Sequence, residues 1–170
     1  MVHGGAWMAG NGSDFDDDCV KAAQAGYIAV NMDYRKIQDL ATAQVMVNGM
    51  GNAIASLKQV LTQKNIKIGK MALAGWSSGA HILLLYAYQY YKTCPIKIAF
   101  LVANSPPTDF LYDAKTANTL MGEFAYTIMS TLTGQIILPG TENLHMDAIK
   151  KISPIYMVKA GVPPTILVYG

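Results

Sequence analysis

Charged side chains and cysteines are scarce in this sequence of 170 residues, and both shortages narrow the classes of protein that fit. Lys, Arg, Asp and Glu make up only 14% of the chain, and the formal net charge is +2. Because no basic cluster is present, the sequence offers no electrostatic support for nucleic-acid binding. The only cysteines, Cys19 and Cys94, fit neither a metal pattern nor a disulfide framework. We expect two buried thiols, with one incidental bridge as the alternative.

Long apolar runs are missing as well. No run approaches the ~18 residues that a membrane span needs. The basic n-region and long apolar h-region of a secretory signal are both absent, which favours the cytoplasm without identifying the compartment. Hydrophobic residues nevertheless make up 52% of the chain, enough for one domain with a real core. Such a composition indicates strands buried on both faces, or surface that a missing partner covers.

Short apolar runs alternate along the chain with segments of helical periodicity. The expected strands are residues 27–32, 71–74, 96–103 and 165–169, and the expected helices are 14–25, 41–63, 80–92, 110–133 and 142–152. This alternation predicts an α/β fold whose mostly parallel sheet is covered by helices on both faces. In such sheets the functional groups gather at the carboxyl ends of the strands.

The first expected helix begins with an acidic run. Ser13 and Asp16 have the spacing of a capping box, and Asp14, Asp17 and Asp18 add negative charge where the helix dipole favours it. A calcium site is the functional alternative, but the alternating oxygen-ligand spacing of a calcium loop is missing.

The pentapeptide Gly75-Trp76-Ser77-Ser78-Gly79 separates an expected strand from an expected helix. A G-x-S-x-G sequence in the order strand, turn, helix is typical of a nucleophile elbow. The pentapeptide alone is a weak signal, and a glycine-rich turn is the plain alternative. The strand and helix that flank it favour the elbow.

A second motif strengthens this interpretation. A serine hydroxyl is a poor nucleophile without a base, and the tetrahedral oxyanion needs fixed N–H donors. The small residues of His3-Gly4-Gly5-Ala6 let backbone N–H groups turn toward such a site, and the N–H of Ser78 is a further candidate donor. The two motifs, in this order at two strand ends, make a stronger pair than either alone.

With these motifs the chain resembles the α/β-hydrolases, and specifically the esterase and lipase branch with an H-G-G-A-W oxyanion segment (hormone-sensitive-lipase-like and feruloyl-esterase-like). The matching segments are residues 3–7, 33–35, 75–81, 105–109, 153–154 and 163–170. The resemblance implies strands three to seven of that fold. It also implies that Ser77 is the nucleophile and that Gly4, Gly5 and Ser78 form the oxyanion hole. We expect no cofactor and no metal, since this chemistry needs none.

The resemblance places the triad acid after strand seven and the base histidine after strand eight, so we expect both to lie beyond residue 170. Residues 1–170 are then a single, incomplete α/β-hydrolase domain, with residues 110–152 as a helical cap. Within the chain, His3 is expected to hold the oxyanion segment. His81 and His145 are the alternatives for the base, and Asp109 for the acid.

The remaining polar and aromatic side chains near the motifs can be interpreted as structural or as functional. Asp33 and Arg35 are expected to form a structural polar pair. Trp7 and Trp76 are expected either to line the substrate pocket or to pack in the core.

Together these features predict a serine hydrolase that cleaves small-molecule carboxylic esters through an acyl-enzyme. The alternatives are a catalytically incompetent hydrolase module that lacks the triad acid and base, and an amidase such as a kynurenine formamidase. We expect no nucleic-acid partner and no membrane span. Exposed sheet edges predict a homo-oligomer.

Overall fold

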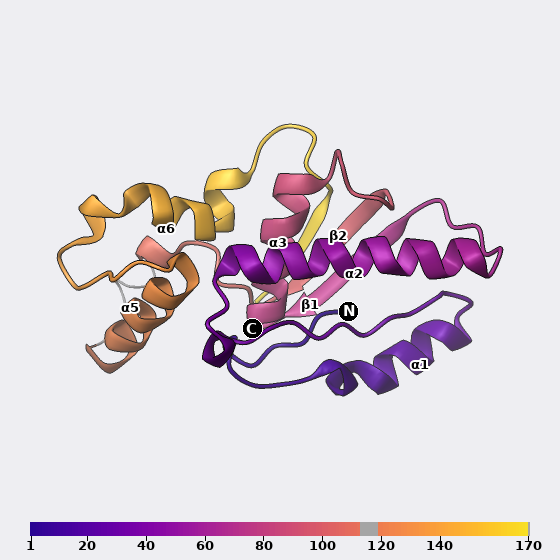
Figure 1. Cartoon of the computed structure of the whole chain (residues 1–170), viewed down its shortest axis with the longest axis horizontal. Coiled ribbons are helices and arrows are strands. Elements are labelled where there is room, and N and C mark those ends of the chain that lie inside the picture. The colour runs from indigo at the N-terminus through magenta and orange to yellow at the C-terminus, as the bar shows by residue number, and fades with distance from the viewer. Residues whose placement is uncertain (113–118, 170) are drawn as a thin grey trace.

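The computed structural model describes residues 1–112 and 119–169, with the side chains of 119–121 left aside (Figure 1). The strands are β1 (Met71–Trp76), β2 (Ile98–Asn104) and β3 (Thr165–Val168). The α-helices are α1 (Asp16–Gln24), α2 (Ala43–Gln63), α3 (Ser77–Tyr90), α5 (Thr119–Thr133) and α6 (Met146–Ile152). Four short 3₁₀ segments are also present, at Gly12–Phe15, Ile37–Asp39, Glu142–Leu144 and Pro154–Met157.

The three strands form one parallel sheet in the order β1-β2-β3. Val2 extends this sheet, because it bridges Gly75 on one side and Met32 on the other, both in parallel. The Val2 N–H donates to the Ala74 carbonyl over 2.9 Å. The N-terminal residues therefore lie between β1 and the segment that ends at Met32.

The strand expected over residues 27–32 is wrong in extent. Only Met32 pairs, through its bridge to Val2, and Tyr27 and Ile28 are 71% and 53% exposed. An apolar run predicts burial only if another element covers it. Here the segment lies at the edge of the sheet, and its side chains are largely open to solvent.

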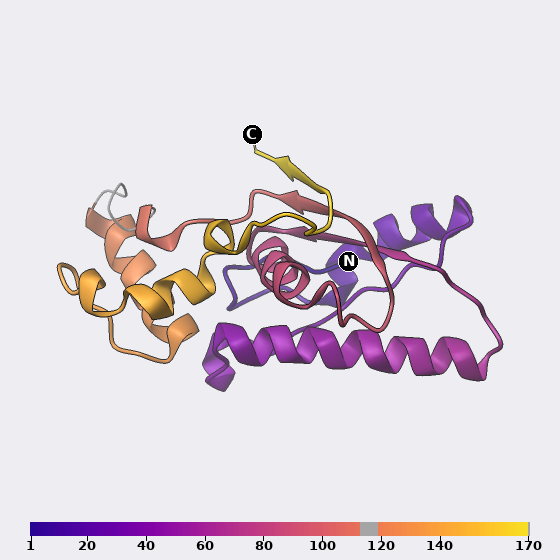
Figure 2. The same ribbon diagram turned by 90° about the horizontal axis from the view of Figure 1, so that it is seen from above.

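Helices flank the parallel sheet, as expected for the fold class, but the expected cover on both faces is corrected, because one face of β1–β3 is open to solvent. Helix α3 packs on β1 and β2, and α2 packs on α3. Figure 2 shows α2 and α1 on opposite sides of the strands. Leu101 and Ala103 of β2 are fully buried beneath α3, whose own residues Ile82 to Leu85 are 0–1% exposed. This layer of α3 between sheet and α2 is the core of the domain.

The other face of β1–β3 carries exposed apolar side chains. Trp76 pairs with Asn104, and Asn104 pairs with Val168, so these side chains share one face. Phe100 and Ile166 lie on the same face by the alternation of the strands. Trp76, Phe100, Ile166 and Val168 are between 42% and 55% exposed. We refer to these four residues as the open apolar face.

Two local expectations are corrected. The capping box is formed by Asn11 and Asp14 rather than by Ser13 and Asp16, because a 3₁₀ turn at Gly12–Phe15 precedes α1. The thiols of Cys19 and Cys94 are free, but they are only partly buried.

The remaining helices follow the predicted pattern with shorter bounds. The expected helix over residues 110–133 contains α5, and residues 113–118 lie outside the described part of the chain. The expected helix over 142–152 is a 3₁₀ turn followed by α6. Figure 1 shows α5 and α6 together at one end of the molecule, beside the sheet rather than on it.

Candidate active site

Ser77 lies where β1 ends and α3 begins, with a φ of +50°. The predicted order of strand, sharp turn and helix is confirmed at this point. A non-glycine residue in the left-handed region costs of order 1–3 kcal/mol and persists only where its surroundings hold it. The strain projects the Ser77 side chain from the carboxyl edge of the sheet, which is the edge where α/β folds gather functional groups.

The first turn of α3 lies directly against the N-terminal residues Val2 and His3. A Cβ built on Gly79 would lie 2.2 Å from the His3 carbonyl oxygen and 2.4 Å from that of Val2. Any side chain at this position would therefore push the two backbones apart. The glycine at the end of the pentapeptide is required by this contact.

The segment His3–Trp7 forms a left-handed loop above the elbow. Gly5 has a φ of +119°, and Ala6 and Trp7 follow with φ of +51° and +60°. The Gly5 carbonyl accepts from the N–H groups of Met8 and Ala9, over 2.9 and 2.8 Å. Two consecutive non-glycine residues with left-handed backbone angles indicate that tertiary contacts hold the loop in this conformation.

The loop and the elbow touch at Gly4. A Cβ on Gly4 would lie 3.3 Å from the Ser77 Cβ and 3.2 Å from the Trp76 carbonyl oxygen. Among the described residues, the N–H groups of Gly4 and Gly5 have no hydrogen-bond partner, and no side chain caps the start of α3. Unpaired N–H groups beside a helix N-terminus favour negative charge. The structure thus places Gly4, one of the predicted oxyanion donors, next to Ser77.

His3 is fully buried and joins the loop to the segment after Met32. Its Nε2 donates to Asp33 Oδ1 over 2.9 Å, and its ring stacks on Tyr34 at 4.4 Å. The role expected for His3, holding the oxyanion segment by hydrogen bonds, agrees with these contacts. The expected pair of Asp33 with Arg35 is corrected, because the partners of the Asp33 carboxylate are His3, the Gly12 N–H and Lys36.

These partners also decide the charge state of Asp33. Burial acts to raise the pKa of this carboxyl, but hydrogen bonds from the Gly12 N–H and His3 outweigh it, so the pKa lies below its ordinary value. Asp33 is ionised at neutral pH and accepts from both partners.

Tyr34 makes a contact with Ser78 that the sequence did not predict. Its hydroxyl lies 3.0 Å from the Ser78 Oγ, in a buried hydrogen bond. The residue after Ser77 is therefore fixed by a side chain from another strand end. The signal was the tyrosine within Asp33-Tyr34-Arg35, which the motif alone did not assign to any partner.

His81 is buried completely, one helical turn after Ser77. Its Nδ1 accepts from the indole N–H of Trp7 over 3.2 Å, and its Nε2–H donates to the Ile152 carbonyl over 2.7 Å. Both ring nitrogens are occupied, so His81 has no lone pair to offer Ser77. These contacts exclude the alternative of His81 as the base in this arrangement.

Burial lowers the pKa of His81 to about 4, and the Ile152 carbonyl offsets only part of this effect. The ring is therefore neutral at pH 7, with its proton on Nε2. The side chains against the ring are Trp7 and Phe110, both uncharged.

The two tryptophans differ in their surroundings. Trp7 is 4% exposed and packs between His81 and Phe110, so core packing describes it. Trp76 is 53% exposed on the open apolar face. A pocket role remains a prediction for Trp76.

The remaining candidate triad residues lie in other settings. His145 is partly exposed, and its Nδ1 lies 2.9 Å from Gln135 Oε1. Asp109 Oδ1 accepts from the N–H groups of Leu111 and Tyr112 over 3.1 and 3.3 Å, as a helix cap does. Of the described histidines, none forms a hydrogen bond with Ser77.

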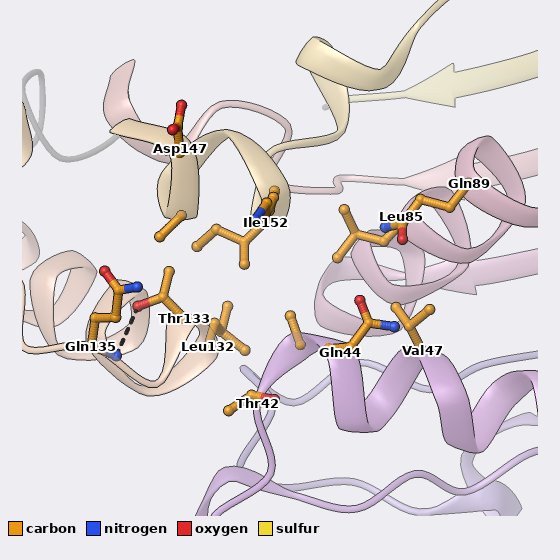
Figure 3. A pocket seen from close by; sticks show the side chains of 13 residues that line it. Thr42, Gln44, Val47, Leu85, Gln89, Leu132, Thr133, Gln135, Asp147 and Ile152 are labelled. Atoms are coloured by element: carbon orange, nitrogen blue, oxygen red, sulfur yellow. Dashed lines mark hydrogen bonds between the residues drawn. The ribbon is translucent and has the colours of Figure 1, made fainter. Parts of the chain in front are cut away.

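A cavity of about 260 Å³ lies apart from Ser77, among α2, α3, α5 and α6 (Figure 3). Val47, Leu85, Leu132 and Ile152 supply its apolar wall, and polar side chains including Gln44 surround them. Over the described parts of the chain, no three His, Cys, Asp or Glu side chains are grouped as metal ligands. No helix in those parts is long and apolar enough to cross a membrane.

Comparison with known proteins agrees with this geometry. The profile of the BD-FAE family matches residues 1–170. The chain belongs to the BD-FAE family. This is a family of esterase-like α/β-hydrolases, and it confirms the resemblance that the two motifs indicated. None of the curated proteins compared with this BD-FAE chain matches it.

Several solved structures share the fold of this BD-FAE domain. An inhibited esterase B from Lactobacillus rhamnosis is 19% identical with a TM-score of 0.80, over 98% of this chain and 53% of its own. A truncated carbohydrate esterase from gut microbiota is 18% identical with a TM-score of 0.72, over 99% and 64%. A bacterial heroin esterase is 20% identical with a TM-score of 0.73, over 98% and 54%. The chain thus spans about half to two thirds of the length of these proteins.

The contact at Gly79 gives a matched pair of substitutions. Gly79→Ala forces a Cβ against two carbonyl oxygens, so we expect a loss of at least about 1–3 kcal/mol in the free energy of unfolding. Gly49 lies in the middle of α2, and a Cβ built there has no atom within 4 Å outside the backbone of its own helix. We therefore expect Gly49→Ala to raise the free energy of unfolding by about 0.5–1 kcal/mol. Urea unfolding measures both, and equal effects of the two substitutions would contradict the close approach at Gly79.

The buried imidazole predicts a dependence of stability on pH. The pKa of His81 falls from an ordinary 6.5 in the unfolded chain to about 4 in the fold, so the unfolded state binds more protons between these values. The contribution of the neutral His81 to the free energy of unfolding is complete above pH 6.5. About 3 kcal/mol of it is lost as the pH falls to 4. Urea unfolding at pH 7 and pH 4 should show this loss in the wild-type protein and not in His81→Asn. Parallel losses in both proteins would refute the assignment.

Proposed function

We propose that this domain supplies the nucleophile and the oxyanion hole of a carboxylic ester hydrolase that forms an acyl-enzyme on Ser77. The observation that carries the proposal is the contact between Gly4 and the strained Ser77, with unpaired N–H groups beside the first turn of α3. Family membership supports the same class of chemistry.

In the proposed reaction, Ser77 Oγ bonds to the ester carbonyl carbon as its proton passes to a base. The carbonyl oxygen becomes an oxyanion and accepts hydrogen bonds from the N–H groups of Gly4, Gly5 and Ser78. The carbon–oxygen bond to the alcohol then breaks, and the alcohol leaves with a proton. Water repeats the attack on the acyl-enzyme and releases the acid.

The proton acceptor must be a group other than His3 or His81. His3 is held between Asp33 and the Gly4 carbonyl, and His81 between Trp7 and Ile152. The family resemblance assigns acid and base to the ends of strands seven and eight. Strand β3 corresponds to strand seven, and its carboxyl end shares one sheet edge with Ser77 because the sheet is parallel.

Small-molecule esters are the proposed substrates. Esterase B from Lactobacillus rhamnosis is described in a form inhibited by a tributyrin phosphonate, and other fold relatives are a carbohydrate esterase and a heroin esterase. These relatives suggest an ester of a short acyl group. We further propose that residues 110–152, which include α5 and α6, act as a cap on the substrate side of the domain.

Hydrolysis of p-nitrophenyl acetate tests the nucleophile. We expect Ser77→Ala to abolish turnover through the acyl-enzyme and to leave at most a small residual rate from the oxyanion hole and substrate binding. Ser105→Ala is the matched control: Ser105 also has a positive φ, of +47°, at the end of β2, and its hydroxyl contacts Asn104. Because none of the described histidines bonds to Ser77, we expect a fluorophosphonate to label wild type and Ser105→Ala only weakly, and Ser77→Ala not at all. Equal turnover by wild type and Ser77→Ala would remove Ser77 from the mechanism, and an unlabelled wild-type protein would favour a binding module.

The open apolar face is proposed to drive self-association of the 170-residue chain, since exposed apolar patches of this kind associate. We expect Ile166→Glu, at 55% exposure on this face, to shift the population toward monomer in light scattering. Ile136 is 80% exposed but lies outside the sheet, so Ile136→Glu should leave the proportion of monomer unchanged. A monodisperse wild-type monomer would contradict the proposal.

A further inference from the structure

We propose that His81 is a positioning residue for the oxyanion hole, because it holds Trp7 and thereby keeps the backbone of Gly4 and Gly5 against Ser77. The inference rests on the proposed function. It assigns a role to a buried imidazole that the acyl-enzyme chemistry leaves unused.

Three separate segments meet at the His81 ring. Trp7 comes from the oxyanion loop, and its ring lies edge-on to His81 at 5.3 Å and 87°. Phe110 follows β2, and its ring lies 5.2 Å from His81 and 5.8 Å from Trp7. The Ile152 carbonyl closes the cluster from the end of α6. His81 is thus the centre of the contacts that connect the elbow helix to its neighbours.

The chemistry of the two partners requires a neutral imidazole at this position. The indole N–H of Trp7 only donates, and the Ile152 carbonyl only accepts. One ring with an acceptor at Nδ1 and a donor at Nε2 satisfies both. Because His81 and Trp7 are 0% and 4% exposed, water cannot replace either bond, and removing the acceptor leaves a buried donor unpaired.

The Trp7 anchor matters because the loop before it is strained. Ala6 and Trp7 both hold left-handed backbones, with φ of +51° and +60°. Such a conformation relaxes when the contact that holds it is lost. Relaxation at Trp7 turns the peptide planes of Gly4 and Gly5, and with them the N–H groups that would face the oxyanion.

A second connection joins the end of α6 to the same cluster of rings, at Phe110. The Ser153 Oγ accepts from the Phe110 N–H over 3.2 Å, one residue after the carbonyl that binds His81. Ile152 also forms part of the wall of the cavity between α2 and α6 (Figure 3). The position of α6 is therefore transmitted through His81 to Trp7.

Three variants separate the two bonds of the ring. His81→Asn places an amide oxygen where Nδ1 lies and so keeps the acceptor for Trp7. His81→Gln reaches the position of Nε2 and keeps the donor for Ile152, but it leaves the Trp7 N–H without an acceptor. Trp7→Phe removes the N–H together with part of the ring system, and retains a buried aromatic ring. His145→Gln, at a partly exposed histidine bound to Gln135, is the matched control.

The rate of fluorophosphonate labelling of Ser77, as a function of probe concentration, separates the limiting rate from the affinity for the probe. Loss of a whole oxyanion donor costs about 10²–10³ in rate, and a displaced donor costs less. We expect His81→Gln and Trp7→Phe to lower the limiting rate about tenfold, with the affinity unchanged. The double variant should be no slower than either single one, since both break the same bond. His81→Asn and His145→Gln should remain within about threefold of wild type.

Hydrogen exchange gives a readout that is independent of labelling. Amides of residues 3–9 should exchange faster in His81→Gln and Trp7→Phe, while those of α2 keep their protection. An unchanged limiting rate in both variants, equal impairment of His81→Asn and His81→Gln, or faster exchange throughout α2 would overturn the inference. A wild-type protein that the probe does not label contradicts the proposed function instead, and the exchange at residues 3–9 still decides the role of His81.

Discussion

The close approach of Val2 and His3 to the first turn of α3 is the constraint on which the rest of the site depends. The carbonyl oxygens of Val2 and His3 lie where a side chain on Gly79 would be. This contact sets the position of the oxyanion loop, because Gly4 follows directly and lies against Ser77. It also sets the direction of α3, since Val2 is hydrogen-bonded to β1 in the sheet below.

Around this contact, each motif is held by a residue from elsewhere in the chain. Asp33 fixes His3, Tyr34 fixes Ser78, and Ile152 fixes His81. The two motifs therefore form a site only when the ends of several strands meet at one edge. The chain belongs to the BD-FAE family, and esterases about 20% identical to it share its fold.

The sequence predicted the elements whose signals are local. The strand before Gly75, the helix after it and the long helix of residues 41–63 follow from apolar periodicity and turn chemistry, and all three are present. The segment of residues 27–32 was mispredicted because its burial depends on a neighbouring element, which periodicity cannot report.

The partners of polar side chains were harder to predict than the motifs. Asp33 and Arg35 are neighbours in sequence, yet the carboxylate binds His3 from another strand end. The bond between Trp7 and His81 likewise joins residues far apart in the chain. Such pairs depend on topology, so they become visible only once the sheet order is known.

The placement of Val2 between Met32 and Gly75 has a consequence for the order of folding. Residues at the start of the chain cannot pair until much later segments have formed, so the oxyanion loop belongs to the non-local contacts of high contact order. Helices α2 and α3 have mainly local hydrogen bonds and can form early. The expected sequence of events is a helical layer with β1 first and the insertion of the N-terminal residues last, so that the site is completed only at the final step of folding.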